Sequence, residues 1–300
     1  MKNRLWIAVD GVLMRRPTRR RPAPVCGSHW VHPRQRNSFF LHRWAGWFAC
    51  ALLALPFAAQ AGTIVRVAVA ADFYKPLETI AAAYSRQSGI HVVASAGSSG
   101  GLYAQITNGA PYDVFLSANA LYPRQLVAGG LAESASRFTY AQGVLVLWGA
   151  QASPAAGPAT LRSAAFAHLA LANPHFAPYG QAAQEVLERL GCLKQLRSRL
   201  VFGEDVGQAL QFANSGGAQY AFVSSAQLLA AGLWRSGSHW VVPVSLYSPI
   251  NQQAVLLVHA RNIEAARSFL RFLRGPARPL IARLGYRLPE VAKSQPPAHR

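Results

Sequence analysis

The serine- and glycine-rich segment at residues 97–101, GSSGG, has the composition of an anion-binding turn. It follows an apolar, β-branched stretch at residues 90–96 and precedes a helix-like segment at residues 102–108. The first turn of a helix has backbone amides without intrahelical acceptors, and these amides favour an anion at that end. Ser98 and Ser99 add two short hydroxyl donors, so we expect this turn to form an anion cradle.

The cradle carries no cation of its own, which excludes a nucleotide-phosphate loop. Such a loop has the pattern GxxxxGK[ST], in which the lysine contacts the terminal phosphates and the hydroxyl binds magnesium. Here the two serines are followed by Gly100, Gly101 and Leu102. An anion at this turn would be held by neutral donors, which suits reversible capture better than cleavage.

Residues 1–61 have the pattern of a secretory leader. An arginine- and proline-rich stretch at 15–43 runs into an apolar core at 44–58, and Ala59-Gln60-Ala61 has the small-x-small pattern of a cleavage site. The core of about 15 residues is shorter than the roughly 20 that a membrane-spanning helix needs. We therefore expect cleavage after Ala61 and a soluble protein in the periplasm.

The charge and cysteine content of the remaining 239 residues narrow the function classes. They contain 20 Lys and Arg against 10 Asp and Glu, a net charge of +10 that favours encounter with anions. The arginines are scattered and no aromatic-interleaved basic motif accompanies them, so we expect no nucleic-acid partner. Cys192 is the only cysteine after residue 61, which excludes an internal disulfide or a cysteine-based metal site there.

Strand-like and helix-like stretches alternate along the rest of the chain, which indicates an α/β architecture with largely parallel sheets. Strands are predicted at residues 64–70, 91–96, 114–117, 144–148, 168–172, 220–224 and 254–258. Apolar spacing predicts helices from Pro76, from Gly180 to a left-handed cap at Gly191, at 206–212 and around 266–273. This length is sufficient for two lobes with cores of their own.

Short sequence motifs occur in a fixed order across nearly all of residues 62–290. They are VAVAADF at 67–73, AGSSG at 96–100, YAQI at 103–106, NGAPYDVFLSA at 108–118, SRFTYA at 136–141, LVLW at 145–148, NP at 173–174, APYG at 177–180 and LRGP at 273–276. Each alone is a weak signal, but the ordered set resembles the periplasmic molybdate-binding proteins that serve ABC importers.

This resemblance implies a two-lobe, type II periplasmic binding protein fold, each lobe having a mixed, mostly parallel sheet flanked by helices. The chain would cross between the lobes near residues 140–144 and 248–253. Lobe I would then comprise residues 62–141 and 252–300, and lobe II residues 142–251. The implied partners are the importer's permease and ATPase. The implied ligand is molybdate or tungstate, with sulfate or another oxyanion as the alternative, and we expect a monomer without a cofactor.

The resemblance also implies a set of ligand-binding residues. The oxyanion would be bound by the hydroxyl and amide of Ser99, by Tyr179 and by the amide of Val206, with further contacts from Ala71, Asp72 and Ser98. Of the two serines, Ser98 has the more structural character. Three of the contacts come from helix N-termini that would converge on one point. Protein groups would meet the oxyanion's oxygens, so we expect no direct ligand to the metal atom.

Asp72 departs from the resembled family, whose members usually have serine or asparagine there. A carboxylate about 4 Å from a dianion, at an effective dielectric of about 20, is repelled by roughly 8 kcal/mol. Protonating an aspartate at pH 7 costs only about 4 kcal/mol. If Asp72 faces the ligand, it should therefore bind a proton together with the anion. Alternatively, its carboxylate caps the following helix. Both hypotheses predict weaker capture at neutral pH than asparagine would give.

The same turn also matches GxSxG, the nucleophile elbow of α/β-hydrolases, with Ser99 as the nucleophile. A serine hydrolase is therefore the alternative function. It needs a downstream acid and histidine, and His168, His175, His239 and His259 are available. None of these histidines has a distinctive sequence context. We therefore expect a binding protein rather than an enzyme.

Overall fold

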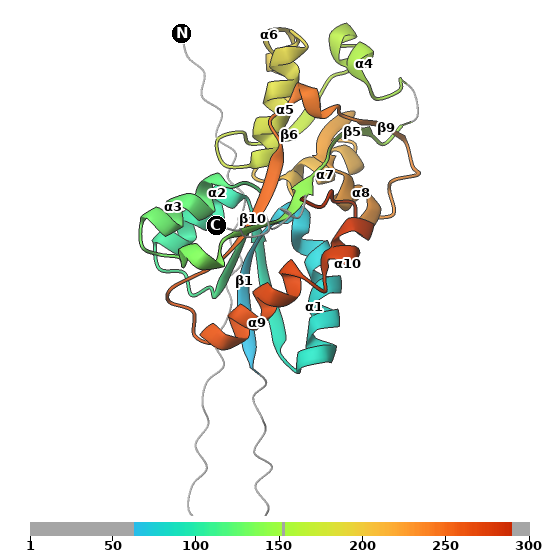
Figure 1. The fold of residues 1–300 in the computed structure, drawn as a ribbon. Helices are drawn as coiled ribbons and strands as arrows, with labels where there is room; N and C mark the ends of the chain where they lie inside the picture. The colour runs from blue at the N-terminus through green and yellow to red at the C-terminus, as the bar shows by residue number, and fades with distance from the viewer. Residues whose placement is uncertain (1–62, 152–153, 290–300) are drawn as a thin grey trace, which may run out of the picture. The chain divides into compact units, whose positions relative to one another are not determined.

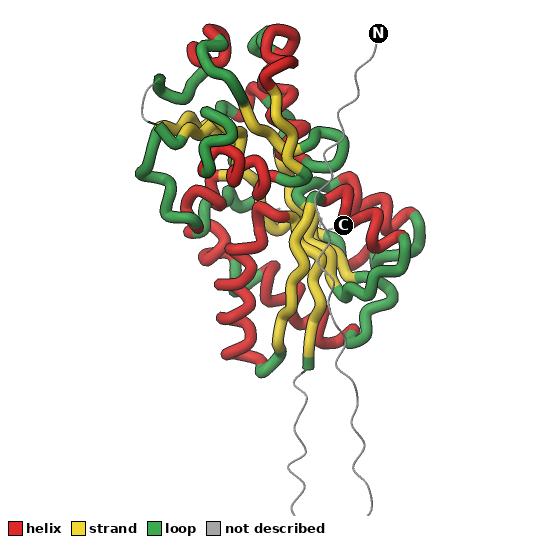
Figure 2. The backbone as a smooth tube through the Cα atoms, turned by 180° about the vertical axis from the view of Figure 1, so that it is seen from behind, coloured by secondary structure: helices red, strands yellow, loops and turns green. Residues whose placement is uncertain are grey.

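The computed structural model describes residues 63–151 and 154–289, and their strands form two five-stranded sheets (Figures 1 and 2). All of these residues belong to one compact unit. The predicted leader, residues 1–61, lies outside the described residues. Within them, no helix combines the length and apolar character that crossing a bilayer requires.

The first sheet has the strand order β2-β1-β3-β10-β4. Its strands are β1 (Ile64–Ala70), β2 (His91–Gly97), β3 (Val114–Ser117), β4 (Phe138–Gly143) and β10 (Ile250–Leu256). β1 pairs in parallel with β2 and β3, whereas β10 pairs antiparallel with β3 and β4. The interior strand β1 is valine-rich and its last four residues are buried, as expected for a strand covered on both faces.

The second sheet has the order β7-β6-β8-β5-β9. Its strands are β5 (Leu145–Gly149), β6 (Leu169–Ala172), β7 (Leu200–Gly203), β8 (Tyr220–Ser224) and β9 (Ser238–Val241). β6 pairs in parallel with β7 and β8, and β5 pairs antiparallel with β8 and β9. In both sheets the described pairings are therefore mixed, as predicted. Parallel pairings make up half of them rather than most.

Helices flank both sheets (Figure 1). The part of the chain that builds the first sheet contains α1 (Tyr74–Ser88), α2 (Ser99–Thr107), α3 (Leu121–Ala128), α9 (Ile263–Arg274) and α10 (Arg278–Arg283). The part that builds the second sheet contains α4 (Pro158–Ser163), α5 (Pro178–Arg189), α6 (Leu193–Leu196), α7 (Val206–Asn214) and α8 (Ser225–Ala230). Short 3-10 turns are η1 (Ala71–Phe73), η2 (Ser134–Ser136), η3 (Arg197–Arg199) and η4 (Val244–Leu246).

The chain passes between the sheets along two neighbouring strands. β4 of the first sheet is separated from β5 of the second by Val144 alone. β10 returns to the first sheet and pairs with β4, with Ile250 opposite Gly143. A β-bulge between Gln252 and Gln253 shifts this pairing by one residue. Bulges redirect side chains, and here both consecutive glutamines are buried.

The buried apolar residues form separate clusters, and one of them involves both sheets. Most of its members come from the part of the chain that builds the second sheet, including Leu171 of β6 and Val186 of α5. Ala70, the last residue of β1, and Ala118, which follows β3 directly, belong to the same cluster. Residues at the carboxyl ends of the first sheet's strands are thus packed against the second sheet's helices.

Candidate functional site

The predicted cradle has the expected strand–turn–helix geometry. β2 ends at Gly97, Ser98 is the N-cap of α2, and Ser99 is the first helical residue. The Ser98 hydroxyl oxygen accepts a hydrogen bond from the Gly101 amide at 3.3 Å. The Ser99 hydroxyl oxygen accepts from the Ala118 amide at 2.9 Å. Since that oxygen acts as an acceptor, the Ser99 hydroxyl keeps its proton free to donate to a ligand.

Tyr179 lies in the first turn of α5 and is almost fully buried. A Cβ on the next residue, Gly180, would overlap the carbonyl of Ala172. Glycine at this position lets α5 begin directly against the end of β6, and this contact determines the position of Tyr179. Burial raises the pKa of the Tyr179 hydroxyl well above its ordinary value of 10. The phenol therefore stays neutral near pH 7, and its hydroxyl can donate a hydrogen bond.

Val206 is the first residue of α7, and Asp205 is its N-cap. The Asp205 carboxylate accepts from the amides of Gly207 at 2.8 Å and Gln208 at 3.0 Å. In the described part of the chain, the Val206 amide has no hydrogen-bond acceptor. The cap thus satisfies the following two amides and leaves the Val206 amide available.

Ala71 and Asp72 form the turn η1, directly after β1. Asp72 is 1 % exposed. Its Oδ2 accepts hydrogen bonds from the Gln252 side-chain amide and, at 3.0 Å, from the Tyr286 hydroxyl. Its Oδ1 is buried and has no hydrogen-bond partner. The helix-capping hypothesis for Asp72 is wrong, because the N-cap of α1 is Phe73 and no side chain makes that cap.

Gln252 connects the first sheet with helix α5 through its side chain. Its Nε2 donates to Asp72 at the end of β1 and, at 3.4 Å, to the hydroxyl of Tyr179 at the start of α5. Its Oε1 accepts from the Tyr140 hydroxyl of β4 at 2.8 Å. Gln252, Tyr140 and Tyr286 were not among the predicted site residues. The available signal was the position of Gln252 and Tyr140 within the two predicted crossings between lobes.

Burial raises the pKa of the Asp72 carboxyl from 3.8 to about 6. Hydrogen bonds from Gln252 and Tyr286 oppose this rise but do not cancel it. Within the described residues, Asp72 forms no ion pair. A carboxyl buried without a counter-cation is costly to ionise, which accounts for the direction of the shift.

The predicted residues come together between the two sheets. Tyr179 and Val206 belong to one buried cluster with Ala118, and Ala71 packs against it. Ser99 reaches the same cluster through its hydrogen bond to the Ala118 amide. Helices α2, α5 and α7 and the turn η1 thus begin around one region, where α2 and α5 contribute hydroxyls and α7 contributes a backbone amide.

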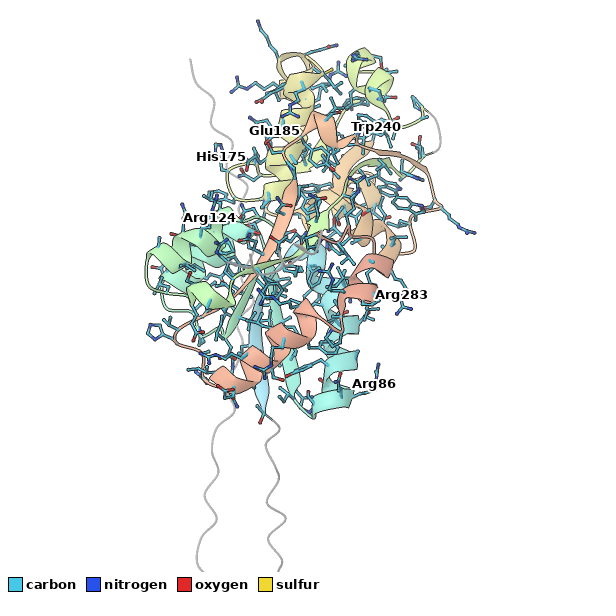
Figure 3. The ribbon with its side chains drawn as sticks, viewed as in Figure 1. Arg86, Arg124, His175, Glu185, Trp240 and Arg283 are labelled. Carbon is cyan, nitrogen blue, oxygen red and sulfur yellow. The ribbon has the colours of Figure 1, made fainter. Side chains whose placement is uncertain are left out.

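Cations are absent from this network in the described part of the chain. The arginines labelled in Figure 3, Arg86, Arg124 and Arg283, are exposed at the surface. No lysine or arginine forms a hydrogen bond with Ser99, Asp72 or Tyr179 among the residues described. The same residues contain no cluster of three His, Cys, Asp or Glu side chains that could hold a metal ion. The available donors are therefore neutral.

A backbone hydrogen bond joins the two sides of the site directly. The Gly100 amide in α2 donates to the carbonyl of Phe176, in the loop before α5, at 2.8 Å. A Cβ on Gly100 would lie 3.0 Å from both the Cα and the carbonyl oxygen of Phe176. The two segments therefore meet backbone to backbone, and a side chain at position 100 would force them to move apart.

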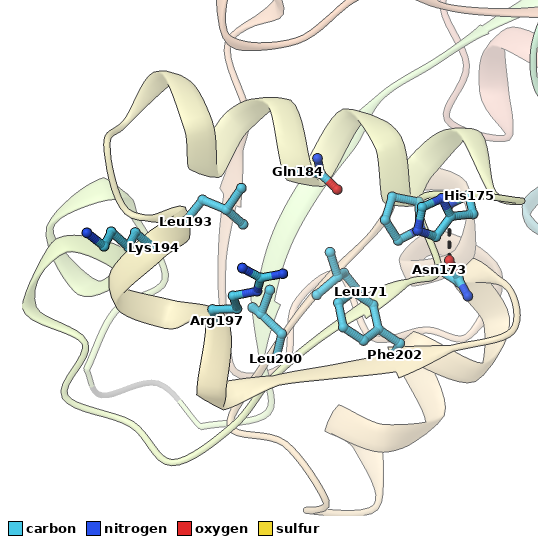
Figure 4. A pocket seen from close by; sticks show the side chains of 10 residues that line it. Leu171, Asn173, His175, Gln184, Leu193, Lys194, Arg197, Leu200 and Phe202 are labelled. Carbon is cyan, nitrogen blue, oxygen red and sulfur yellow. Dashed lines mark hydrogen bonds between the residues drawn. The ribbon is translucent and has the colours of Figure 1, made fainter.

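One cavity borders this region, and a second cavity lies elsewhere in the molecule. One, of about 520 Å³, is lined by Ala71 and Asp72 together with Lys75, Glu204 and Asp205. The other, of about 570 Å³, lies against α5, α6 and β7 and is lined mainly by apolar side chains with Lys194 and Arg197 (Figure 4). None of the predicted site residues lines the second cavity.

The geometry around Ser99 does not favour a hydrolase. A nucleophilic serine needs a histidine within hydrogen-bond distance of its hydroxyl. In the described residues, the partner of the Ser99 hydroxyl oxygen is the Ala118 amide, and none of the candidate histidines bonds to it.

Comparison with known proteins identifies the family. A family model described as bacterial extracellular solute-binding protein matches residues 65–287. The chain belongs to this family. Among its solute-binding relatives, it is 43% identical over 246 residues to the molybdate-binding protein ModA of Azotobacter vinelandii, covering 81% of this chain and 94% of the relative. It is 42% identical over 235 residues to that of Rhodobacter capsulatus, covering 78% and 91%.

Solved structures of solute-binding proteins share the fold. The structure of the Azotobacter vinelandii periplasmic molybdate-binding protein matches with a TM-score of 0.73 and 41% identity, over 75% of this chain and all of that one. The chain thus has the two-lobe, type II periplasmic binding protein fold with two mixed sheets. The sequence resemblance to this family and its fold are confirmed.

Proposed function

We propose that this solute-binding protein captures a tetrahedral oxyanion, molybdate or tungstate, in the cleft between its lobes. The main support is the convergence of neutral donors from α2, α5, α7 and η1 on one buried region. Two relatives above 40% identity are molybdate-binding proteins, which indicates this class of oxyanion. Sulfate is the alternative ligand, because the same neutral donors suit any tetrahedral dianion.

The donor set matches the needs of such an anion. The Ser99 and Tyr179 hydroxyls supply two donors, and the amides of Val206, Ala71 and Asp72 supply three more. Ser98 caps α2 and supports the turn that carries Ser99. Backbone amides at helix N-termini favour negative charge without introducing a fixed cation, so the anion can also be released.

Closure of two lobes around the anion would complete the site. We propose residues 62–141 and 252–300 as lobe I and residues 142–251 as lobe II. The hydrogen bond between Gly100 and Phe176 joins the two proposed lobes at the site. Closure of this kind around a ligand is a common motion in two-lobe proteins.

In this proposal the protein acts outside the cytoplasm after removal of residues 1–61. It would hand the oxyanion to the permease and ATPase of an ABC importer and perform no chemistry on it. One solved relative is named as periplasmic, which supports the same compartment for this chain.

An anion panel tests the proposal. The full chain is expressed with its leader and purified from the periplasm, and its melting temperature is measured with molybdate, tungstate, sulfate, phosphate and chromate. A ligand that binds only the folded state stabilises it by RT ln(1 + [L]/Kd), where [L] is the free ligand concentration, and so raises the melting temperature. We expect stabilisation by molybdate and tungstate. Stabilisation by sulfate alone would support the alternative ligand, and no shift with any anion would contradict oxyanion capture.

A further inference from the structure

The buried carboxylate of Asp72 has one oxygen that the protein leaves without a partner. Oδ2 accepts from Gln252 and Tyr286, whereas Oδ1 has no donor although it is buried. Buried polar atoms are almost always hydrogen-bonded, so an exception at a binding site indicates a missing partner. This inference rests on the proposed function, in which Asp72 lies beside the oxyanion.

The groups around Asp72 offer no charge that could neutralise it. Three buried tyrosines face it, Tyr140 from β4, Tyr179 from α5 and Tyr286 from the segment after α10. The cavity that Asp72 lines also has Glu204 and Asp205 before α7, which are themselves acidic. Its one cation is Lys75 of α1, whose ammonium group is paired with Glu78 at 3.0 Å. Gln252 of β10 and Gln227 of α8 are neutral.

An unpaired carboxylate beside a dianion cannot donate a hydrogen bond, because an ionised carboxyl has acceptors only. A protonated carboxyl has one O–H, and that O–H can donate to an anion oxygen. Since Oδ2 is occupied by two donors, Oδ1 is the oxygen available for this proton. A proton at Oδ1 would remove the repulsion and supply the missing hydrogen bond in one step.

We propose that the site binds its oxyanion together with one proton, which lies between Oδ1 of Asp72 and an oxygen of the anion. The proton comes from solvent on binding and returns to solvent on release. No bond other than this O–H changes. Asp72 is thus a specificity-determining residue, because the O–H that it gains from solvent can donate only to an anion with an oxygen acceptor at that position.

The proposal predicts a pH dependence with a definite sign. Burial already raises the pKa of the free protein's Asp72 carboxyl to about 6, and an adjacent dianion raises it further. At pH 5 the carboxyl is mostly protonated before binding, so little further proton is taken up. At pH 7.5 it is mostly ionised, and binding takes up about one proton. The dissociation constant should then rise about tenfold per pH unit above pH 7.

Calorimetry can count the proton. The binding enthalpy of molybdate is measured at pH 7.5 in two buffers whose ionisation enthalpies differ, and again at pH 5. The slope of the observed binding enthalpy plotted against the buffer's ionisation enthalpy gives the number of protons taken up. The variants are Asp72→Asn, which is nearly isosteric and cannot ionise, and Glu204→Gln, which removes an exposed carboxylate of the same cavity as a matched control.

We expect an uptake of about one proton at pH 7.5 for the wild type and for Glu204→Gln, and none for Asp72→Asn. Asp72→Asn should also bind at least tenfold more tightly at pH 7.5, with an affinity that no longer changes with pH. Binding by the wild type without proton uptake would overturn the inference and leave the proposed function standing, as would proton uptake by Asp72→Asn. If neither the wild type nor Asp72→Asn bound any anion of the panel, the proposed function itself would fail.

Discussion

Ser98 and Ser99 are neighbours of the same type, yet their hydroxyls make different contacts. The Ser98 oxygen accepts from the Gly101 amide and caps α2. The Ser99 oxygen accepts from the Ala118 amide, which leaves its proton for the ligand. The choice of Ser99 as the better ligand and Ser98 as the more structural serine remains a prediction that substitutions can test.

Ser99→Ala should weaken molybdate binding by about 10- to 100-fold, the usual value of a hydrogen bond to a charged group. Ser98→Ala should instead lower the free energy of unfolding by about 1 kcal/mol through loss of the helix cap, with a smaller effect on affinity. Calorimetry and urea denaturation of both variants measure the two effects separately. Equal affinity losses for the two variants would contradict these assignments.

Asp72 should also control the pH dependence of stability in the free protein. Its pKa is about 6 in the folded state against 3.8 ordinarily, so the folded state binds the proton more tightly. This tighter proton binding therefore stabilises the folded state to its full extent below pH 4, and the stabilisation is lost as the pH rises through 6. The loss amounts to at most about 3 kcal/mol.

In Asp72→Asn the side chain does not titrate, so this loss of stability does not occur. The difference in the free energy of unfolding, variant minus wild type, should therefore be larger at pH 7.5 than at pH 4. Urea denaturation without oxyanion at both pH values measures the difference. Other titrating groups are common to both proteins and cancel in the comparison. An unchanged difference between the two proteins across this range would contradict the raised pKa.

The sequence allowed the six candidate site residues to be selected, but only in part for physical reasons. The Ser99 turn could be recognised from its own composition, whereas Tyr179, Val206 and Ala71 depended on the family resemblance. Gln252 and Tyr286 could not be found, because each gains its role from a partner about 200 positions away. Such partners depend on strand order, which local sequence patterns do not contain.

At the scale of elements, the approach of α2 to the loop before α5 depends on one glycine. Gly100→Ala would place a Cβ 3.0 Å from the backbone of Phe176 and 2.7 Å from the Tyr122 hydroxyl. We expect this variant to resist closure and to bind the oxyanion at least tenfold more weakly. Small-angle scattering should show little decrease in its radius of gyration when molybdate is added.

Gly97→Ala is the matched control for that substitution. Its Cβ would contact only the side chain of Leu102, at 3.4 Å or more, and no atom of the opposite segment. This variant should close and bind like the wild type. If Gly100→Ala also closed normally, the backbone contact between Gly100 and Phe176 would have no role in capture.

Most strands with a strong apolar pattern were predicted at their observed positions, including β1, β3 and β8. β4, β7 and β9 were not predicted as strands. β9, SHWV, is half exposed at a sheet edge, so polar and apolar residues mix within it. The share of antiparallel pairing was also underestimated. Local patterns define a strand, but its direction depends on how the chain returns between the lobes.

At the scale of the whole molecule, the positive charge should act on the rate of encounter. Residues 62–300 carry a net charge of +10, and the arginines labelled in Figure 3 lie at the surface. Long-range attraction of this kind is screened by salt, whereas the contacts within a closed site are not. We expect the association rate constant for molybdate to fall several-fold between about 10 and 150 mM salt, while the dissociation rate constant changes little.

Stopped-flow fluorescence at several ionic strengths measures both rate constants. The salt should be one whose anion is not a tetrahedral oxyanion, since a competing ligand would also slow association. An association rate that does not change with salt would show that the surface charge plays no part in capture.

The pairing of β4 with β10 has a mechanical consequence for the molecule. Two strands that pass side by side between the halves and hold each other by a ladder can flex together, but one cannot rotate freely around the other. Relative movement of the halves is therefore restricted to bending about one axis. A pair of fluorophores, one on each half, should then report capture as a single reproducible change in separation, which makes this protein a suitable scaffold for an oxyanion sensor.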